Sequence, residues 1–327
     1  MPSWWSEPIF EDMHRAQSLS DRRRPFVRGA LLLVLLALLS PQACTVNGQD
    51  APDPLLSDQN MRDYWFSGQA ELTRYELEQA RYGEIHRGDA VLIFVTEEFL
   101  PDLQVKYEHG PGVGRIPILK LNFTKQFNTG IYPYSLMTSI FTPFGSSPAS
   151  RTLKTSMSGQ EWCGHVYTQF NLDDDEYRVR AHSYFQDEAD QDFRVPAALL
   201  EDEIWTRLRL NPESLPTGSI EIIPATQYLR LRHLEPAVVT ANATRTGAIS
   251  GTRHYRLEYT NPARTLDIEF EAEFPYAIVG WTETFESGWG DRARVLTTRA
   301  RRTHTLRQDY WNHNRNADRV YRTELGL

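Results

Sequence analysis

The residues whose types are most suited to chemistry are concentrated between positions 160 and 170. If this stretch is one β-strand, Glu161, Cys163 and His165 point to the same side, because alternate residues of a strand share a face. A carboxylate, a thiol and an imidazole form the set that Cys/His-type hydrolases and transferases use. The sequence therefore gives a catalytic hypothesis, with His165 as base, Cys163 as nucleophile and Glu161 as the group that orients the base.

Strand geometry weakens this catalytic hypothesis. Neighbours on one strand face lie about 7 Å apart, which is too far for direct proton transfer unless long side chains lean together. A thiol nucleophile also usually takes its base from another segment of the chain. The alternative is a small buried Cys163 and a hydrogen-bonded His165 with structural roles, which we favour. Catalysis remains open, and we lean against it.

Other reactive motifs are missing from the sequence. It contains no Gly-rich phosphate loop, no His-Glu-x-x-His helix, no Cys-x-x-Cys pair and no nucleophile elbow. The acidic stretches 173–176 and 187–192 lack the central glycine of a calcium loop. We therefore expect neither a metal nor a cofactor. The net charge of −8 also argues against general nucleic-acid binding, which needs a positive surface.

Aromatic side chains offer a binding function instead of a catalytic one. The chain contains 15 Tyr, 15 Phe and 8 Trp, and a curved sheet with aromatic faces can form an apolar cleft, although such residues belong to a core more often. The candidates for contact with an apolar or amphipathic ligand are Tyr132, Tyr134, Trp162, Tyr167 and Trp281.

Alternation of apolar and polar residues predicts strands along most of the chain. A turn is expected at 86–89, and the basic stretch 292–307 is expected to be a solvated edge strand. Only the stretch after Pro196 predicts a helix, because apolar residues recur there every four positions and Asn211-Pro212 ends the pattern. The expected strands are 64–66, 72–75, 81–85, 90–95, 119–123, 130–142, two or three within 151–185, 219–223, 227–233, 255–259, 266–272, 277–285 and 292–307.

This order of elements predicts the fold class. Strand follows strand through short, turn-rich connections, which favours antiparallel pairing over βαβ units. We expect a mainly β protein of antiparallel curved sheets, or a partly open barrel or clam in two halves, with one helix at the seam. The N-terminal β half would span 63–195, and the helix with the C-terminal β half would span 196–327.

The N-terminal residues have the pattern of an export signal. Basic residues at 22–28 precede an apolar run at 30–39 and then Ala43-Cys44. That run is about ten residues long, whereas a spanning helix needs about 20. We expect a signal peptide at 1–43, acylation of Cys44 and a flexible tether at 44–62. Several alternatives stay open. The protein could be simply secreted or keep an uncleaved anchor, and it could use the Sec or the twin-arginine route. Translation could start at Met1 or Met13, and the destination could be either membrane.

Several short motifs are shared with a known family. The chain resembles an uncharacterised bacterial envelope family whose members are sometimes labelled septum formation inhibitor Maf, over most of 63–327. True Maf proteins resemble cytoplasmic nucleotide pyrophosphatases with an N-terminal phosphate loop on an α/β scaffold. This sequence has neither feature, so that activity is rejected, and the resemblance supplies no site residues. The motifs lie at 70–77, 81–85, 94–97, 120–123, 129–135 and 160–164.

Together these features predict an exported, lipid-anchored envelope protein that binds an apolar or amphipathic ligand without catalysis. A structural or assembly component that binds a protein partner is the first alternative. A Cys/His-type enzyme is the second. The expected partners are a membrane, reached through the acyl group at Cys44, and a lipid or envelope protein, with no nucleic acid and no cofactor.

Overall fold

The computed structural model describes residues 54–145 and 150–327, and antiparallel β-strands dominate it. Sixteen strands within these residues form one sheet that does not close into a barrel. The predicted mainly β, antiparallel class is therefore confirmed. The strands are β1 (Ala70–Arg81), β2 (Glu84–Leu100), β3 (Val105–Lys106), β4 (Ile116–Thr129), β5 (Tyr132–Pro143), β6 (Lys154–Glu161), β7 (Gly164–Asp173), β8 (Glu176–Ser183), β9 (Asp190–Pro196), β10 (Leu199–Leu200), β11 (Gly218–Ile223), β12 (Val239–Arg245), β13 (Thr252–Thr260), β14 (Ala263–Glu271), β15 (Ile278–Ser287) and β16 (Arg294–Gln308).

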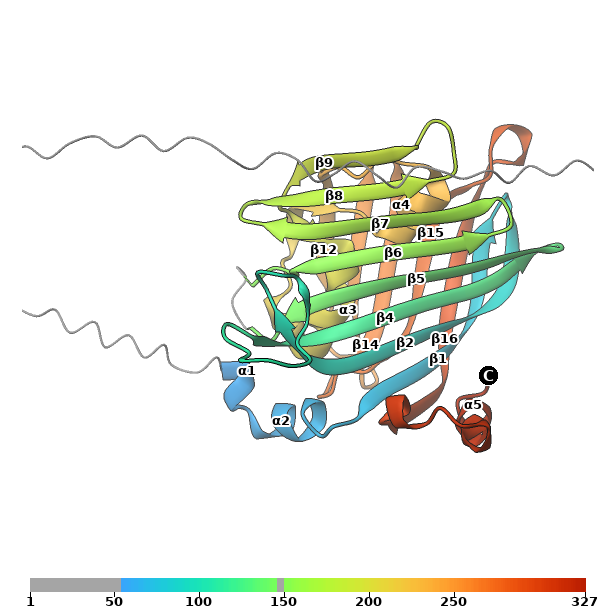
Figure 1. The fold of residues 1–327 in the computed structure, drawn as a ribbon. Helices are drawn as coiled ribbons and strands as arrows, with labels where there is room; N and C mark the ends of the chain where they lie inside the picture. The colour runs from blue at the N-terminus through green and yellow to red at the C-terminus, as the bar shows by residue number, and fades with distance from the viewer. Residues whose placement is uncertain (1–53, 146–149) are drawn as a thin grey trace, which may run out of the picture. The chain divides into compact units, whose positions relative to one another are not determined.

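The order of strands divides the sheet into two adjoining groups. It runs from β10 in sequence to β16, then through β1, β2 and β4 to β9, while β3 pairs beside β2. The groups meet where β16 pairs with β1. Figure 1 shows β4–β9 in front and β12–β16 behind, with α3 and α4 between them. The helices are α1 (Pro54–Ser57), α2 (Gln59–Trp65), α3 (Glu201–Leu210), α4 (Thr226–Arg232) and α5 (Val320–Glu324), and the 3-10 turns are η1 (Pro212–Ser214), η2 (Gly290–Arg292), η3 (Tyr310–Asn312) and η4 (Asn316–Arg319).

Helix α3 confirms the helix predicted after Pro196. It ends before Asn211, and acidic residues fill its first turn, where they complement the helix dipole. The helix is buried on every side, including its charged residues. Arg209, for example, donates to both carboxylate oxygens of Glu71 in β1, each at 2.6 Å. The sequence pattern of one apolar face did not indicate this complete burial.

Four predicted elements are wrong. The strand expected at 81–85 is instead the β1–β2 turn, because β1 ends at Arg81, β2 begins at Glu84, and Tyr82 and Gly83 between them have positive φ. Tyr64 and Trp65 belong to α2 and Phe66 is its C-cap; in this helix Met61 and Trp65 recur one turn apart and are both buried. Residues 227–233 lie in α4 and its C-cap, and this helix packs against β5 and β6. Residues 86–89 continue β2 instead of turning: Gly88 lies so close to the neighbouring strand that a Cβ there would come 2.1 Å from the Gln126 carbonyl oxygen.

The predicted edge position of 292–307 is also wrong. Strand β16 pairs with β15 on one side and β1 on the other, which places it in the middle of the sheet. Two of its arginines are paired with acids on other strands: Arg301 lies 3.3 Å from Glu76 of the neighbouring β1, and Arg302 lies 2.7 Å from Glu271 at the end of β14. Opposite charges across strands stabilise a sheet, so a basic strand does not need an edge position.

The predicted leader lies outside the described residues. This applies to the signal peptide at 1–43, the lipidation site Cys44 and the tether as far as residue 53. The rest of the tether, from Pro54, lies in α1 and α2. Within residues 54–145 and 150–327, no helix combines the length and apolar character needed to cross a membrane.

Candidate functional site

The stretch 160–170 is a hairpin, so the prediction of one continuous strand is wrong. Strand β6 ends at Glu161 and β7 begins at Gly164, with Trp162 and Cys163 in the turn. Gly164 has a φ of 155°, a conformation that other residues rarely adopt. The chain reversal pairs Glu161 with Gly164, so the three predicted catalytic residues do not share one strand face. The glycine next to Cys163 was the available signal of a turn.

The structure separates the environments of the three predicted catalytic residues. Glu161 accepts hydrogen bonds from Arg230 and, at 3.1 Å, from the Tyr132 hydroxyl. Cys163 is a free, exposed cysteine in the described part of the chain, so the favoured prediction of a buried cysteine is wrong; it lies in a turn, and its backbone N–H donates to the Tyr132 hydroxyl at 2.7 Å. His165 is exposed near the start of β7. The predicted catalytic roles therefore remain predictions without an assembled triad.

The predicted ligand-contact residues fall into two groups. Trp281 lies in the core, with its ring centroid 5.3 Å from Phe123 and 5.2 Å from Trp205. Tyr167 is exposed and donates to Gln169 in the same strand at 2.6 Å. The other three, Tyr132, Tyr134 and Trp162, lie together at the end of the sheet that carries the β6–β7 turn.

At that end, aromatic rings from several hairpins form a continuous chain, which we call the aromatic rim. Tyr132 lies 6.0 Å from Trp162 and 5.3 Å from Tyr134 between ring centroids. The Tyr134 hydroxyl is hydrogen-bonded to that of Tyr82 at 2.7 Å, and Tyr82 lies 5.7 Å from Trp289. His233 then connects Trp289, at 6.2 Å, to Phe185, at 5.3 Å. The rim comprises Tyr82, Tyr132, Tyr134, Trp162, Tyr184, Phe185 and Trp289.

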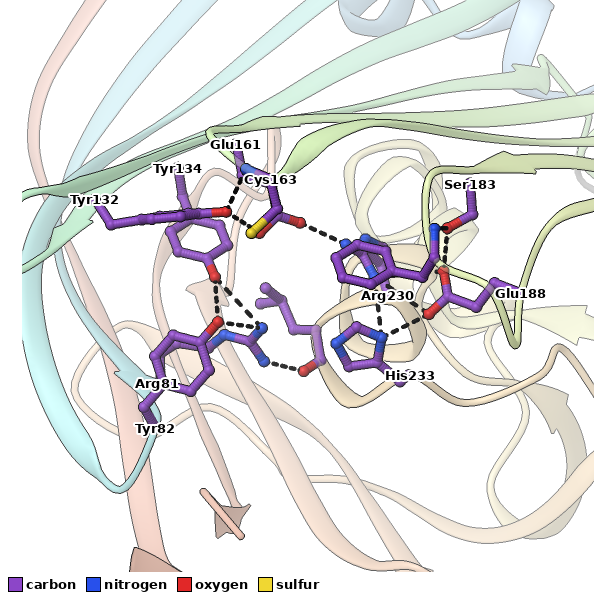
Figure 2. Close-up of polar contacts among 12 residues, drawn as sticks. Arg81, Tyr82, Tyr132, Tyr134, Glu161, Cys163, Ser183, Glu188, Arg230 and His233 are labelled. Atoms are coloured by element: carbon purple, nitrogen blue, oxygen red, sulfur yellow. Dashed lines mark hydrogen bonds and ion pairs between the residues drawn. The ribbon is translucent and has the colours of Figure 1, made fainter.

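An ion-pair network links the rim to α4 (Figure 2). Arg230, near the C-terminal end of α4, pairs with Glu161 of β6 and with Glu188 of the β8–β9 loop, the latter at 3.3 Å. Glu188 also accepts hydrogen bonds from His233 Nδ1 and from the Ser183 hydroxyl, each at 2.5 Å. Partial burial would raise the pKa of Glu188, but these hydrogen bonds and the Arg230 charge hold it below its ordinary value.

Arg81, the last residue of β1, holds the end of α4 from the other side. Its guanidinium donates to the Leu231 carbonyl, an acceptor that the last turn of a helix leaves unused. It also donates to the hydroxyls of Tyr82 and Tyr134, at 3.2 and 3.4 Å. Burial, followed by the hydrogen bond with Tyr82, raises the pKa of Tyr134 above its ordinary value, so this hydroxyl stays protonated. The rim is therefore fastened to α4 by charged hydrogen bonds.

A cavity of about 620 Å³ lies beside this network, between α4 and strands β7 and β8. We call it the α4 pocket. It exists because α4 packs against β5 and β6 and leaves the strands toward the free edge β9 less covered. One part of its wall is apolar, with Val166, Phe170 and Leu229, and another part carries the charged side chains of Arg230 and Glu188.

Sequence reasoning missed the residues at the centre of this site. The sequence pattern places Arg230 and His233 in a strand, and Glu188 in an acidic stretch that lacks the glycine of a calcium loop. The available signal was the basic run Arg230-Leu231-Arg232-His233, since basic residues favour helix C-termini. His233 has a φ of 55° and forms the left-handed C-cap of α4, a position that strand prediction could not anticipate.

A second charged cluster, the central cluster, lies between the two layers. Arg264 of β14 donates to both oxygens of Glu201 in α3, at 2.6 and 2.5 Å, and to Glu283 of β15 at 2.7 Å. All three side chains are buried. Asp202 accepts from the Thr226 hydroxyl at 2.8 Å, which ties α3 to the start of α4. The adjoining cavity measures only about 20 Å³, room for roughly one water molecule.

No group of three or more His, Cys, Asp and Glu side chains within 54–145 and 150–327 is placed to hold a metal ion. Comparisons with protein-family models, curated proteins and solved structures found no match. The geometry of the α4 pocket and of the aromatic rim therefore carries the functional argument.

Proposed function

We propose that the protein is an exported, lipid-anchored envelope protein that binds an amphipathic ligand in the α4 pocket without catalysis. The leader and the Ala43-Cys44 pair support export and anchoring. The observation that carries the binding proposal is the cavity of about 620 Å³ with an apolar part and a charged part. Pockets for small ligands usually measure about 300–1,000 Å³ and combine apolar walls with a few polar groups.

The two parts of the wall suit the two parts of an amphipathic molecule. An apolar chain placed against Val166, Phe170 and Leu229 would gain about 0.8 kcal/mol for each buried methylene. The polar head would then lie near Arg230 and Glu188, whose charges are already paired with each other. Because those pairs exist without ligand, the head group does not have to compensate an isolated buried charge.

Two alternative functions have different support. A structural or assembly role with a protein partner is supported by the exposed aromatic side chains of the rim. The Cys/His-type enzyme has less support, since Cys163 lies in a turn and His165 lies across the hairpin. We therefore place ligand binding first.

A titration with the apolar fluorophore N-phenyl-1-naphthylamine tests the pocket directly. Ala181 of β8 lines the cavity, and Ala181→Trp would fill part of it. Arg180→Trp introduces the same ring at the next position, outside the lining residues, and is the matched control. We expect Ala181→Trp to weaken binding at least about tenfold, equivalent to about 1.4 kcal/mol, and Arg180→Trp to leave it unchanged.

Equal affinity in the wild type and Ala181→Trp would show that the fluorophore binds elsewhere. The circular dichroism spectra of both variants establish that neither change has unfolded the sheet. Native mass spectrometry after gentle extraction would then identify whether a lipid or a protein stays with the chain, which separates ligand binding from an assembly role.

A further inference from the structure

Five hairpin turns meet at the rim end of the sheet, and each exposes a large apolar side chain. The register places them together: Gly88 of β2 pairs with Phe127 of β4, Tyr134 of β5 with Glu161 of β6, and Val166 of β7 with Ser183 of β8. Figure 1 shows these turns projecting from one end of the sheet. The exposed side chains are Tyr82, Ile131, Trp162, Tyr184 and Trp289.

The exposure of these side chains is high for their size. Ile131 is 83% exposed, Tyr184 is 72% and Trp162 is 64%. Large apolar groups that remain this accessible mark interaction sites when they gather at one place. Trp and Tyr combine an apolar ring with a polar N–H or O–H, and they concentrate where a membrane meets water. Four of the five exposed residues are of these two types.

We propose that the rim end docks on the interface of an electrically neutral, zwitterionic lipid bilayer. The three most exposed side chains, Ile131, Trp162 and Tyr184, stand on separate turns, so each can enter the headgroup layer by itself. A stable protein interface instead needs a closely packed, fully buried centre, which separated turns do not supply.

Charge selects the kind of bilayer. The exposed turns and the strand residues that border them carry Glu84, Asp187, Asp190 and Asp291 against Arg292 and Arg294, while the other acid of the β8–β9 loop, Glu188, is already paired with Arg230. This balance is slightly negative, so anionic lipid would repel the rim end. Surfaces that bind anionic membranes instead carry clusters of Lys and Arg. The aromatic side chains therefore supply the attraction, and electrostatics disfavours an anionic surface.

The natural Cys163, in the turn next to Trp162, gives a direct test. In the full chain with Cys44→Ser, Cys163 is the remaining thiol and can carry the polarity-sensitive fluorophore NBD. We expect a blue shift when dioleoylphosphatidylcholine vesicles are added. The double variant Tyr184→Ser/Trp289→Ser should reduce vesicle affinity about tenfold, because two rings no longer leave water. The matched control, Cys44→Ser/Cys163→Ser/Val113→Cys, carries NBD at position 113 instead, since Val113 is exposed in the β3–β4 connection at the other end.

Three results would overturn the proposal. An equal shift at position 113 would mean that another part of the chain holds the vesicle. Stronger binding when a third of the lipid is phosphatidylglycerol would contradict the preference for a neutral surface. A shift that needs no vesicles and rises with protein concentration would identify the rim as a contact between copies. Since no pocket ligand is added, this assay and the fluorophore titration of the α4 pocket can fail independently.

Discussion

The central cluster and the rim network solve the same electrostatic problem in different surroundings. Each places one arginine between two glutamates, Arg264 with Glu201 and Glu283 and Arg230 with Glu161 and Glu188. The central cluster borders a cavity of about 20 Å³, whereas the rim network borders one of about 620 Å³.

This difference is the basis on which we propose a structural role for the central cluster and a binding role for the rim network. In the central cluster, paired charges connect α3 to the back layer of the sheet, and a ligand has no room to reach them. At the rim, Glu188 and His233 keep 28% and 33% of their side-chain surface exposed, so water or a ligand can replace a lost contact. We therefore expect the same type of substitution to act mainly on stability at the first site and mainly on binding at the second.

The largest expected effect is the loss of the central arginine. Arg264→Met removes the partner of two buried carboxylates, and stranding buried charges costs about 3–5 kcal/mol of unfolding free energy. Arg230→Met should cost less, about 1–3 kcal/mol, because water reaches Glu188, and the more buried Glu161 keeps its hydrogen bond from Tyr132. Urea denaturation followed by circular dichroism measures both. Equal losses would remove the distinction between the two clusters.

A smaller effect is a pH dependence of opposite sign at the two sites. Burial, and then the Glu201 charge, raises the pKa of Asp202 to about 7 from its ordinary 3.8. Between these values the folded protein holds a proton that the unfolded chain has lost, so the contribution of Asp202 to the unfolding free energy falls as pH rises. Asp202→Asn keeps an acceptor for Thr226 and should remove this decline between about pH 4 and 7.

Glu188 should show the reverse dependence. Its pKa lies below the ordinary 4.5, so its stabilising contribution is present above that pH and is lost as pH falls through the lowered value. Glu188→Gln should flatten the loss of stability on the acid side of about pH 4.5, without changing the decline assigned to Asp202. Urea denaturation across this pH range measures both slopes, and two slopes of the same sign would contradict the comparison.

The smallest expected effect is that of Cys163. The thiol is exposed in a turn, so Cys163→Ser should change the unfolding free energy by less than about 0.5 kcal/mol and leave fluorophore binding in the α4 pocket unchanged. Treatment of the wild type with iodoacetamide is the companion measurement. If alkylation abolishes fluorophore binding but Cys163→Ser does not, the added bulk at the turn closes the pocket. If both abolish binding, the Cys163 thiol has a functional role.

Sequence patterns were sufficient where the buried face of an element repeats with a regular period. The β13–β14 hairpin is an example, because Tyr255, Leu257 and Tyr259 alternate with polar residues and Ile268 and Phe270 do the same on the partner strand. Sequence patterns failed for elements that are buried on all sides, or that are covered by segments distant in the sequence. In α4, Tyr228, Leu229 and Leu231 are all buried, so their spacing does not distinguish a helix from a strand.

The sequence by itself determined the class of the protein: mainly antiparallel β-strands, with a helix after Pro196, because side-chain periodicity is a local property. Only the tertiary structure decided that the strands join into one sheet with β16 beside β1, and that Arg230, Glu188 and Glu161 meet beside a pocket. These residues come from segments up to 69 positions apart, and no local pattern encodes such contacts. Their meeting depends on how the sheet folds around α3 and α4, which is set by the packing of the whole core.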